Sequence, residues 1–252
     1  MNTPTMIPVI AIDGPTASGK GAVAQAVARE LGFHYLDSGA LYRLVALQAL
    51  RAGWAAETEL DVAHEQQLAE WASALDARFL DETILLDGED VSQAIRQEST
   101  GNMASKIATV GALRQALLQR QRDFAQAPGL VADGRDMASV VFPDALAKIF
   151  LTADAQIRAE RRYKQLIDKG FSANMTNLVA DLQARDARDM ARAFAPLKPV
   201  ADAYVLDTSH MSLAQAIQTV IAQYQACAKL AHQTDRTSTR LNSSHSRASR
   251  MP

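Results

Sequence analysis

The strongest chemical signal in the chain is a glycine-rich loop near its N-terminus. The loop and the residue after it are Gly14, Pro15, Thr16, Ala17, Ser18, Gly19, Lys20, Gly21 and Ala22, which match the spacing G-x-x-x-x-G-K. Glycines in such a loop let backbone N–H groups turn toward phosphate oxygens, and a helix that starts there adds the positive end of its dipole. We therefore predict that residues 14–22 bind the phosphates of a nucleotide, with the charge of Lys20 on the outer phosphates. An ordinary glycine turn is the alternative, but it would leave Lys20 as an unexplained positive charge at a helix N-terminus.

The loop departs from the usual pattern at Gly21, where a Ser or Thr commonly binds magnesium. A metal ion would then be held by phosphates, by water and by carboxylates from elsewhere in the chain. Asp13 and Asp133 each end a predicted parallel strand, and ligand sites of α/β proteins form at that edge of the sheet. Either one is a candidate magnesium ligand through water, and a structural helix-capping role is the alternative for each. The guanine-recognition sequence N-K-x-D does not occur, which weakens the interpretation as a GTPase switch.

Arginines are concentrated at helical spacings in the C-terminal half of the chain. The two sets are Arg158, Arg161 and Arg162, and Arg185, Arg188 and Arg192. Each set lies on one face of a predicted helix, and a solvated face with salt bridges is the alternative to a phosphate site. Arg135 follows another predicted strand, and Arg43 follows Asp37-Ser38-Gly39. So many cations exceed what one ATP requires, and they favour two phosphorylated ligands.

Composition limits the classes of partner. The 252 residues include 26 Lys and Arg against 28 Asp and Glu, and the isoelectric point is about 6.2. This balance excludes binding to nucleic acid or anionic lipid that is driven mainly by electrostatic attraction. The single cysteine, Cys227, cannot form an intrachain disulfide, and the N-terminal apolar run gives way at Asp13, too early for a membrane span. We expect a cytoplasmic protein without nucleic-acid or membrane partners.

The order of predicted elements indicates an α/β fold with a parallel five-stranded sheet. Apolar runs that suit buried strands are Ile7–Asp13, Phe33–Leu36, Gly129–Asp133, Lys148–Thr152 and Tyr204–Asp207. Helical patterns cover 20–31, 40–52, 58–75, 94–126, 153–168, 176–192 and 212–230. A small antiparallel meander is predicted over 76–92, because short apolar segments there alternate with the turns Asp81-Glu82 and Asp87-Gly88.

The last 21 residues differ in composition from the rest. Residues 232–252 are rich in Ser and Arg and have no apolar period. This pattern predicts a disordered tail that is not part of the native protein. A basic RNA-binding tail is the alternative.

Five segments together resemble the bacterial cytidylate kinase family of the nucleoside monophosphate kinase superfamily. They are DGPTASGKG, LDSGALYR, ADGRDMASVVFPDA, RAERR and RDARDMARAFAPL, and the similarity extends over about residues 6–230. The resemblance implies a P-loop fold in which ATP, with Mg²⁺, phosphorylates CMP or dCMP. Glycine at position 21 is usual in that superfamily. A related kinase for UMP, AMP or shikimate is the closest alternative, and a regulatory module that hydrolyses or senses ATP is an alternative from another class.

The resemblance also implies roles for individual residues. Ser38, Arg43 and Arg135 would hold the CMP phosphate; Ser105, Arg114 and Asp136 would recognise the base; Asp189 and Arg192 would engage the ribose and phosphate. Lys20, Arg158, Arg162 and Arg185 would be catalytic, with no general base, because a CMP phosphate oxygen is already an anionic nucleophile. The expected domain, 6–231, comprises a core (6–40, 105–153, 195–231), a CMP-binding region (about 41–104) and a lid (about 154–172). We expect a monomer.

Overall fold

A parallel five-stranded sheet forms the centre of the molecule. The computed structural model describes residues 7–248 apart from 56, 81–82, 169 and 171–173, with side chains as far as residue 231 and at 233. The strands, in order across the sheet, are β2 (His34–Asp37), β6 (Leu130–Gly134), β1 (Val9–Asp13), β7 (Ala147–Thr152) and β8 (Tyr204–Asp207). Every neighbouring pair is parallel. The predicted fold class and its five strands are confirmed.

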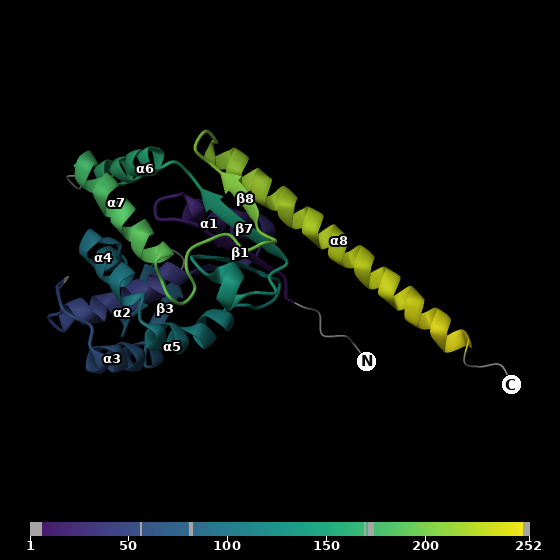
Figure 1. Cartoon of the computed structure of the whole chain (residues 1–252), viewed down its shortest axis with the longest axis horizontal. Helices are drawn as coiled ribbons and strands as arrows, with labels where there is room; N and C mark the ends of the chain where they lie inside the picture. Colours follow the sequence, from purple (N-terminus) through teal and green to yellow (C-terminus); the bar gives the residue numbers. More distant parts are fainter. Residues whose placement is uncertain (1–6, 56, 81–82, 169, 171–173, 249–252) are drawn as a thin grey trace.

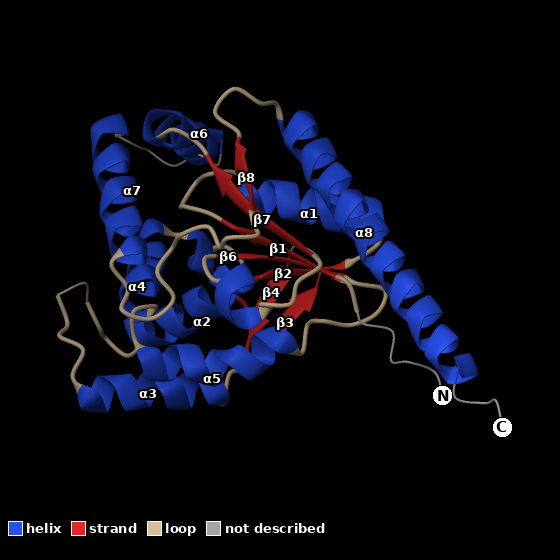
Figure 2. Cartoon of the chain, turned by 45° about the vertical axis from the view of Figure 1, so that its right-hand side comes forward, coloured by secondary structure: helices blue, strands red, loops and turns tan. Residues whose placement is uncertain are grey.

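The sheet is buried on both faces, as the continuous apolar runs predict. Within β1, Val9 and Ala11 belong to one hydrophobic cluster, whereas Ile10 and Ile12 belong to the other. Helices α1 (Lys20–Leu31) and α8 (Leu213–Ala248) cover the face of Ile10, and α2 (Ser38–Arg51) and α5 (Gly111–Arg122) cover the opposite face (Figure 2). Each fully buried isoleucine contributes about 1.5–3 kcal/mol to stability. The packed sheet thus positions the residues at its carboxyl edge.

The two helices that follow β1 and β2 begin directly at that edge. Helix α1 starts at Lys20 and ends at Leu31, and the next residue, Gly32, caps it in a left-handed conformation (φ 66°) that places its N–H near the carbonyls of Ala28 and Arg29. Helix α2 starts at Ser38, because the carboxylate of Asp37 accepts the N–H of Ala40 at 3.1 Å. The first residues of both helices therefore lie at the carboxyl edge of the sheet.

A second region is built from helices around a small antiparallel sheet. Its elements are α3 (Val62–Ser73), β3 (Ala77–Leu80), β4 (Thr83–Leu86), β5 (Glu89–Asp90), η1 (Ala94–Arg96) and α4 (Glu98–Ile107). The helical pattern predicted over 94–126 is divided into η1, α4 and α5, because the backbone is extended at Gln97 and at Val110. The side chain of Val110 is buried in the core. After β6 come η2 (Met137–Val141) and then α6 (Ala155–Asp168) and α7 (Met175–Met190), which lie side by side (Figure 1).

Helix α8 differs from the sequence expectation at its C-terminal end. Disorder is predicted from residue 232, but the backbone is helical as far as Ala248, and residues 249–252 lie outside the described residues. No Gly or Pro interrupts the chain between Leu213 and Ala248, so nothing local ends the helix. This part projects away from the body of the molecule (Figure 1), in keeping with its lack of an apolar period. That it is not native stays a prediction.

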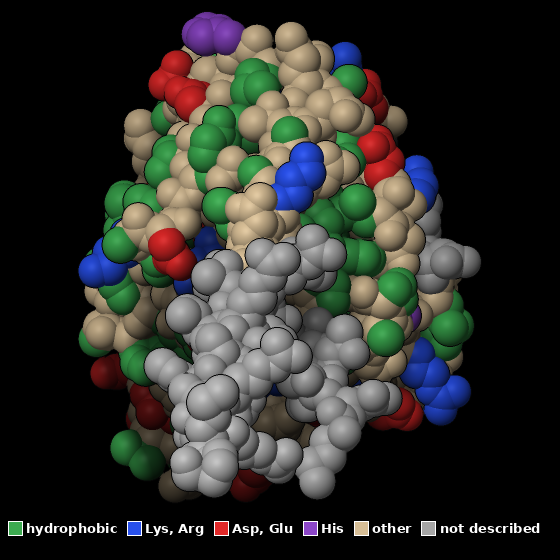
Figure 3. All heavy atoms as spheres, turned by 90° about the vertical axis from the view of Figure 1, so that its right-hand side faces the viewer, with side chains coloured by type: hydrophobic (Ala, Val, Ile, Leu, Met, Phe, Trp, Pro, Cys, Tyr) green, Lys and Arg blue, Asp and Glu red, His purple; other side chains and the backbone are tan. Residues whose placement is uncertain are grey.

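One face of the molecule carries charged side chains of both signs (Figure 3). On the face seen in Figure 3, Lys and Arg side chains are interspersed with Asp and Glu among the described residues. Within the described part of the chain, no helix combines the length and the hydropathy needed to cross a bilayer.

Truncation after residue 231 is expected to leave the midpoint of thermal unfolding unchanged. The α8 side chains that enter the core are Ala216, Ile217, Val220 and Ile221, all before the cut. Circular dichroism melts of the full and shortened chains test this. Truncation after residue 215 is the control, because it removes those four side chains and should lower the midpoint strongly. A loss at 231 as large as that of the control would contradict the prediction.

Candidate functional site

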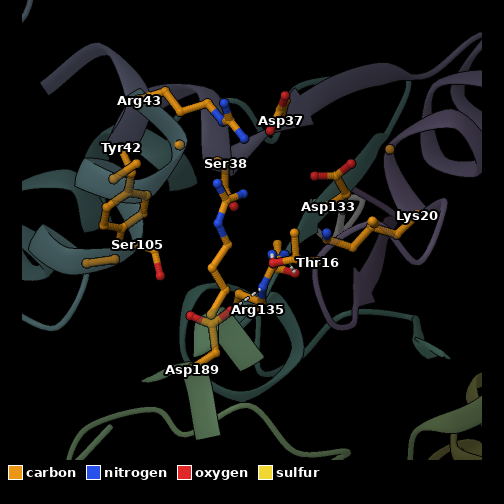
Figure 4. A pocket seen from close by; sticks show the side chains of 18 of the residues that line it. Thr16, Lys20, Asp37, Ser38, Tyr42, Arg43, Ser105, Asp133, Arg135 and Asp189 are labelled. Carbon is orange, nitrogen blue, oxygen red and sulfur yellow. Dashed lines mark hydrogen bonds and ion pairs between the residues drawn. The ribbon is translucent and has the colours of Figure 1, made fainter. Parts of the chain in front are cut away.

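A cavity of about 360 Å³ opens at the carboxyl edge of the sheet. Its walls come from the glycine-rich loop, the start of α2, helix α4, the segment after β6, and helices α6 and α7 (Figure 4). The residues predicted from the sequence that line it are Thr16, Ala17, Lys20, Gly21, Ser38, Arg43, Ser105, Arg114, Asp133, Arg135, Asp136, Arg162, Arg185, Asp189 and Arg192. Gly14, Pro15, Ser18, Gly19 and Ala22 belong to the loop but do not line the cavity. Residues up to 176 positions apart thus converge on one site.

The loop after β1 holds a lysine at one end of the cavity. A Cβ at Gly14 would lie 2.0 Å from the carbonyl oxygen of Leu151, so only glycine fits where the loop leaves the strand. Lys20 extends toward Asp133 (Figure 4). Burial, and next the charge of Arg135, lower the pKa of Lys20 to about 8. An anion bound beside Lys20 would restore its full positive charge.

Asp133 occupies the space beside Gly21. A Cβ at Gly21 would lie 3.0 Å from Oδ2 of Asp133, so a Ser or Thr there would crowd the carboxylate. The hydroxyl of Tyr35 donates a hydrogen bond to the same oxygen at 3.1 Å. Burial, and next the charge of Asp37, raise the pKa of Asp133 to about 7. A carboxylate therefore stands where other phosphate loops present a hydroxyl, and its oxygens suit a magnesium ion bound through water.

Asp13 has a structural role. Its two carboxylate oxygens accept the backbone N–H groups of Met137 and Ala138, each at 2.8 Å, and it does not line the cavity. Burial raises its pKa to about 6. Of the two predicted metal candidates, only Asp133 therefore faces the site. Within the described residues, no three His, Cys, Asp or Glu side chains are grouped to hold a metal ion, so phosphate oxygens and water would have to complete the coordination of magnesium.

Opposite the loop, Asp189 joins two arginines. Its Oδ2 accepts Nε of Arg135 at 2.7 Å, and its Oδ1 accepts Nη2 of Arg192. Arg135 also donates to the hydroxyl of Thr16 at 2.9 Å, so it connects α7 to the phosphate loop (Figure 4). The position of Arg135 between the loop and α7 lets one cation contact phosphates from either side of the cavity.

A second pair lies at the far end, near Ser105 and Tyr42. Nη2 of Arg114 donates to Oδ2 of Asp136, and Nη1 of Arg114 donates to the carbonyl of Ala108 at 3.1 Å. Both side chains are buried, and Nε of Arg114 has no hydrogen-bond partner. This end of the cavity thus offers a donor and an acceptor side by side, which suits a planar polar ring.

The arginines of α6 and α7 face in different directions. Arg162 and Arg185 line the cavity, but Arg158 does not. Arg158 is buried and donates to the carbonyl of Thr16 at 3.0 Å and to Asp186 at 2.6 Å. In this arrangement Asp186 and the loop backbone take up the guanidinium of Arg158, and its catalytic role stays a prediction.

Comparisons with known proteins identify the family of this chain. The profile of the family described as "Cytidylate kinase" matches residues 10–226. A cytidylate kinase of Bordetella bronchiseptica is 57% identical over 219 residues, which cover 87% of this chain and 96% of that protein. One of Cupriavidus necator is 57% identical over 222 residues, 88% of this chain and 97% of that protein. The chain belongs to the cytidylate kinase family.

As a member of the cytidylate kinase family, the protein is a phosphotransferase, and the resemblance drawn from its five motifs is confirmed. Among solved structures, a gluconokinase from Sinorhizobium meliloti matches more distantly, with 14% identity, a TM-score of 0.45, and coverage of 90% of this chain and 98% of that one.

Some lining residues of this kinase site were not predicted. Asp37 and Tyr42 flank the predicted Ser38 and Arg43, and Gln165 lies on α6 beside Arg162. Tyr42 lies four residues after Ser38, so helical spacing on α2 was a signal that could have found it. Gln165 lies three residues after Arg162 on α6, so the same helical spacing could have found it as well.

Asp133→Asn is expected to reduce the pH dependence of stability in the nucleotide-free protein. The folded-state pKa of about 7 lies above the ordinary value of 3.8, so the folded state binds the proton more tightly. The stabilisation is complete below about pH 4 and is lost as the pH rises through about 7. Thermal midpoints across this range should fall less for the variant than for wild type. Asp181→Asn, at an exposed position, is the control, and equal falls in all three proteins would contradict the prediction.

Proposed function

We propose that the protein transfers the γ-phosphoryl group of ATP to CMP or dCMP, giving ADP and CDP or dCDP. The observation that carries the proposal is a single cavity with a phosphate loop at one end and the Arg114–Asp136 pair at the other. A module that only binds or hydrolyses ATP would not need the Arg114–Asp136 pair at the other end of the cavity. Family membership supports the same acceptor.

The ATP phosphates would lie on the loop of residues 14–22. Helix α1 begins at Lys20, so its N-terminal N–H groups and the lysine converge on anionic oxygens. Magnesium would be held by the phosphates, by water and by Asp133, and when bound it would neutralise charge on the transferring group. Arg158 would serve ATP indirectly, because it holds the backbone of Thr16.

The CMP phosphate would lie among Ser38, Arg43 and Arg135, and the ribose beside Asp189 and Arg192. The cytosine ring would lie between Ser105 and the Arg114–Asp136 pair. Cytosine presents an amino donor, which suits a carboxylate, next to two acceptors, which suit a guanidinium. Uracil presents an oxygen in place of the amino group, so it would meet Asp136 with like polarity.

Catalysis would depend on position and charge. The acceptor oxygen of CMP is already anionic, so no side chain has to remove a proton. Lys20, Arg162 and Arg185 all line the cavity, and they would balance the charge that spreads over the phosphoryl oxygens in the transition state. We also propose that the protein acts as a monomer in the cytoplasm, with ATP, CMP and dCMP as small-molecule substrates.

Lys20→Ala is expected to lower kcat by roughly 100- to 1000-fold, the scale for the loss of one preorganised charged donor. ADP release measured with saturating ATP and CMP tests this. The thermal midpoint should not fall, because Lys20 is a cation whose burial lowers its pKa and so opposes its charged form. Lys229→Ala, an exposed position on α8, is the control. Wild-type turnover in Lys20→Ala would contradict the proposal.

Asp136→Ala is expected to lower kcat/KM for CMP by at least ~10-fold, the lower range for one good base contact. The ratio of CMP to UMP activity should fall as well, because the repulsion of uracil disappears with the carboxylate. ADP release is measured with CMP, dCMP, UMP and AMP as acceptors, and Asp123→Ala, at an exposed position, is the control. If the variant keeps the full preference for CMP, base recognition lies elsewhere, with Ser105 and Arg114 next to test.

A further inference from the structure

The first turn of α4 gathers arginines from three other elements. Arg43 comes from α2, Arg162 from α6 and Arg185 from α7, and all three line the cavity. Two of these arginines, Arg162 and Arg185, donate to side-chain oxygens of α4: both bind Glu98, and Arg185 also binds Asn102. Glu98 does not line the cavity, so it contacts two of the arginines from outside the site.

Glu98 binds one arginine with each carboxylate oxygen. Its Oε1 accepts Nε of Arg162 at 2.8 Å and also Nη2 of that residue, and its Oε2 accepts Nη2 of Arg185 at 2.6 Å. The side chain of Arg185 is only 5% exposed and that of Arg162 20%. Burial raises the pKa of Glu98, but Arg185 and then Arg162 outweigh this and lower it below its usual value. Glu98 is therefore an anion shared by two helices.

The rest of the turn completes the arrangement. Asn102 accepts Nε of Arg185 at 2.9 Å. A Cβ at Gly101 would lie 3.2 Å from Nη2 of Arg185 and 3.3 Å from both terminal nitrogens of Arg43. Glycine at position 101 thus leaves room for two guanidinium groups to approach one helix, and a larger side chain there would press on both.

The cluster has more positive than negative charge. Arg43 makes its hydrogen bond to the carbonyl of Ile95, at 2.7 Å, and not to a carboxylate. Burial lowers the pKa of Arg43, the charge of Asp37 opposes this, and the charges of Arg185 and Arg162 add to the lowering. Three cations face two carboxylates, those of Glu98 and Asp37, so the cluster keeps a net positive charge that favours an anion bound between the arginines. A phosphoryl group during transfer carries negative charge on three oxygens, and this charge would balance that of the arginines.

We propose that Glu98 is a positioning residue for phosphoryl transfer, which holds Arg162 of α6 and Arg185 of α7 together so that both face the transferring group. This role rests on the proposed function. Glu98 touches neither substrate nor the reacting atoms; it acts through the two arginines. Because α4 lies beside the acceptor end and α6 beside the loop, the same carboxylate also joins the two sides of the cavity.

Glu98→Gln tests the proposal, because it keeps the size of the side chain and removes the charge. We expect kcat to fall roughly tenfold, the loss typical of a charge-assisted hydrogen bond, with KM for CMP nearly unchanged. Affinity for an ATP–CMP bisubstrate analogue should fall by a similar factor, whereas affinity for CMP alone should not. The matched control is Glu65→Gln, which also removes a carboxylate from the first turn of a helix, α3.

Two results would overturn the proposal. One is a Glu98→Gln enzyme with the kcat and analogue affinity of Glu65→Gln. The other is a loss of activity that follows a fall in the thermal midpoint and affects kcat and CMP affinity alike, as a merely structural role would produce.

Gly101→Ala is a second variant, expected to lower kcat by crowding Arg185 and Arg43 while Glu98 stays in place. If the wild-type enzyme releases no ADP in response to CMP, the proposed function fails, and the role of Glu98 fails with it. If the wild-type enzyme is active and Glu98→Gln is as active as Glu65→Gln, only the role of Glu98 is wrong.

Discussion

Several guanidinium groups converge on one cavity, where they repel one another. Carboxylates placed between them offset that repulsion. Asp189 joins Arg135 and Arg192, and Glu98 joins Arg162 and Arg185. The same carboxylate–guanidinium pairing occurs between Arg114 and Asp136 and between Arg158 and Asp186. A buried guanidinium that lost its carboxylate would cost the fold several kcal/mol, so the pairs decide where these side chains can stand.

These pairs also prepare the cavity for its ligands. An arginine held by a carboxylate on one side has its remaining N–H donors in fixed directions, so little freedom is lost when a phosphate binds. The pairs differ in their place relative to the cavity. Asp136 and Asp189 line it, whereas Asp186 and Glu98 lie outside the lining.

The phosphate loop depends on the same principle. Its backbone at Thr16 is held by Arg158 and Asp186: the carbonyl accepts from the arginine, and the N–H donates to the carboxylate at 3.3 Å. Arg135 binds the hydroxyl of the same residue. Hydrogen bonds therefore join α6 and α7 to the loop, and the elements around the cavity form one connected network.

The sequence by itself determined the fold class, the five strands, the glycine-rich loop and the family, because each depends on residues close together in the chain. Buried strands appear as apolar runs, and helix starts and ends appear as Asp37 and Gly32. The sequence also predicted many of the residues that the structure places around the cavity, through motifs such as Gly134-Arg135-Asp136. That α8 continues beyond residue 231 could not be read from composition, because a polar segment without Gly or Pro suits a helix as well as a coil.

Only the tertiary structure decided which way each arginine faces. Helical spacing put Arg158 and Arg162 on one face, yet Arg158 turns to Asp186 and Arg162 lines the cavity. The partners of Glu98 lie 64 and 87 residues away in the chain, so no local pattern marks it. Asp13 and Asp133 both end strands of the sheet, but one carboxylate caps backbone amides and the other faces Lys20. The direction of a charged side chain is set by the charges that packing brings around it, and those come from distant segments.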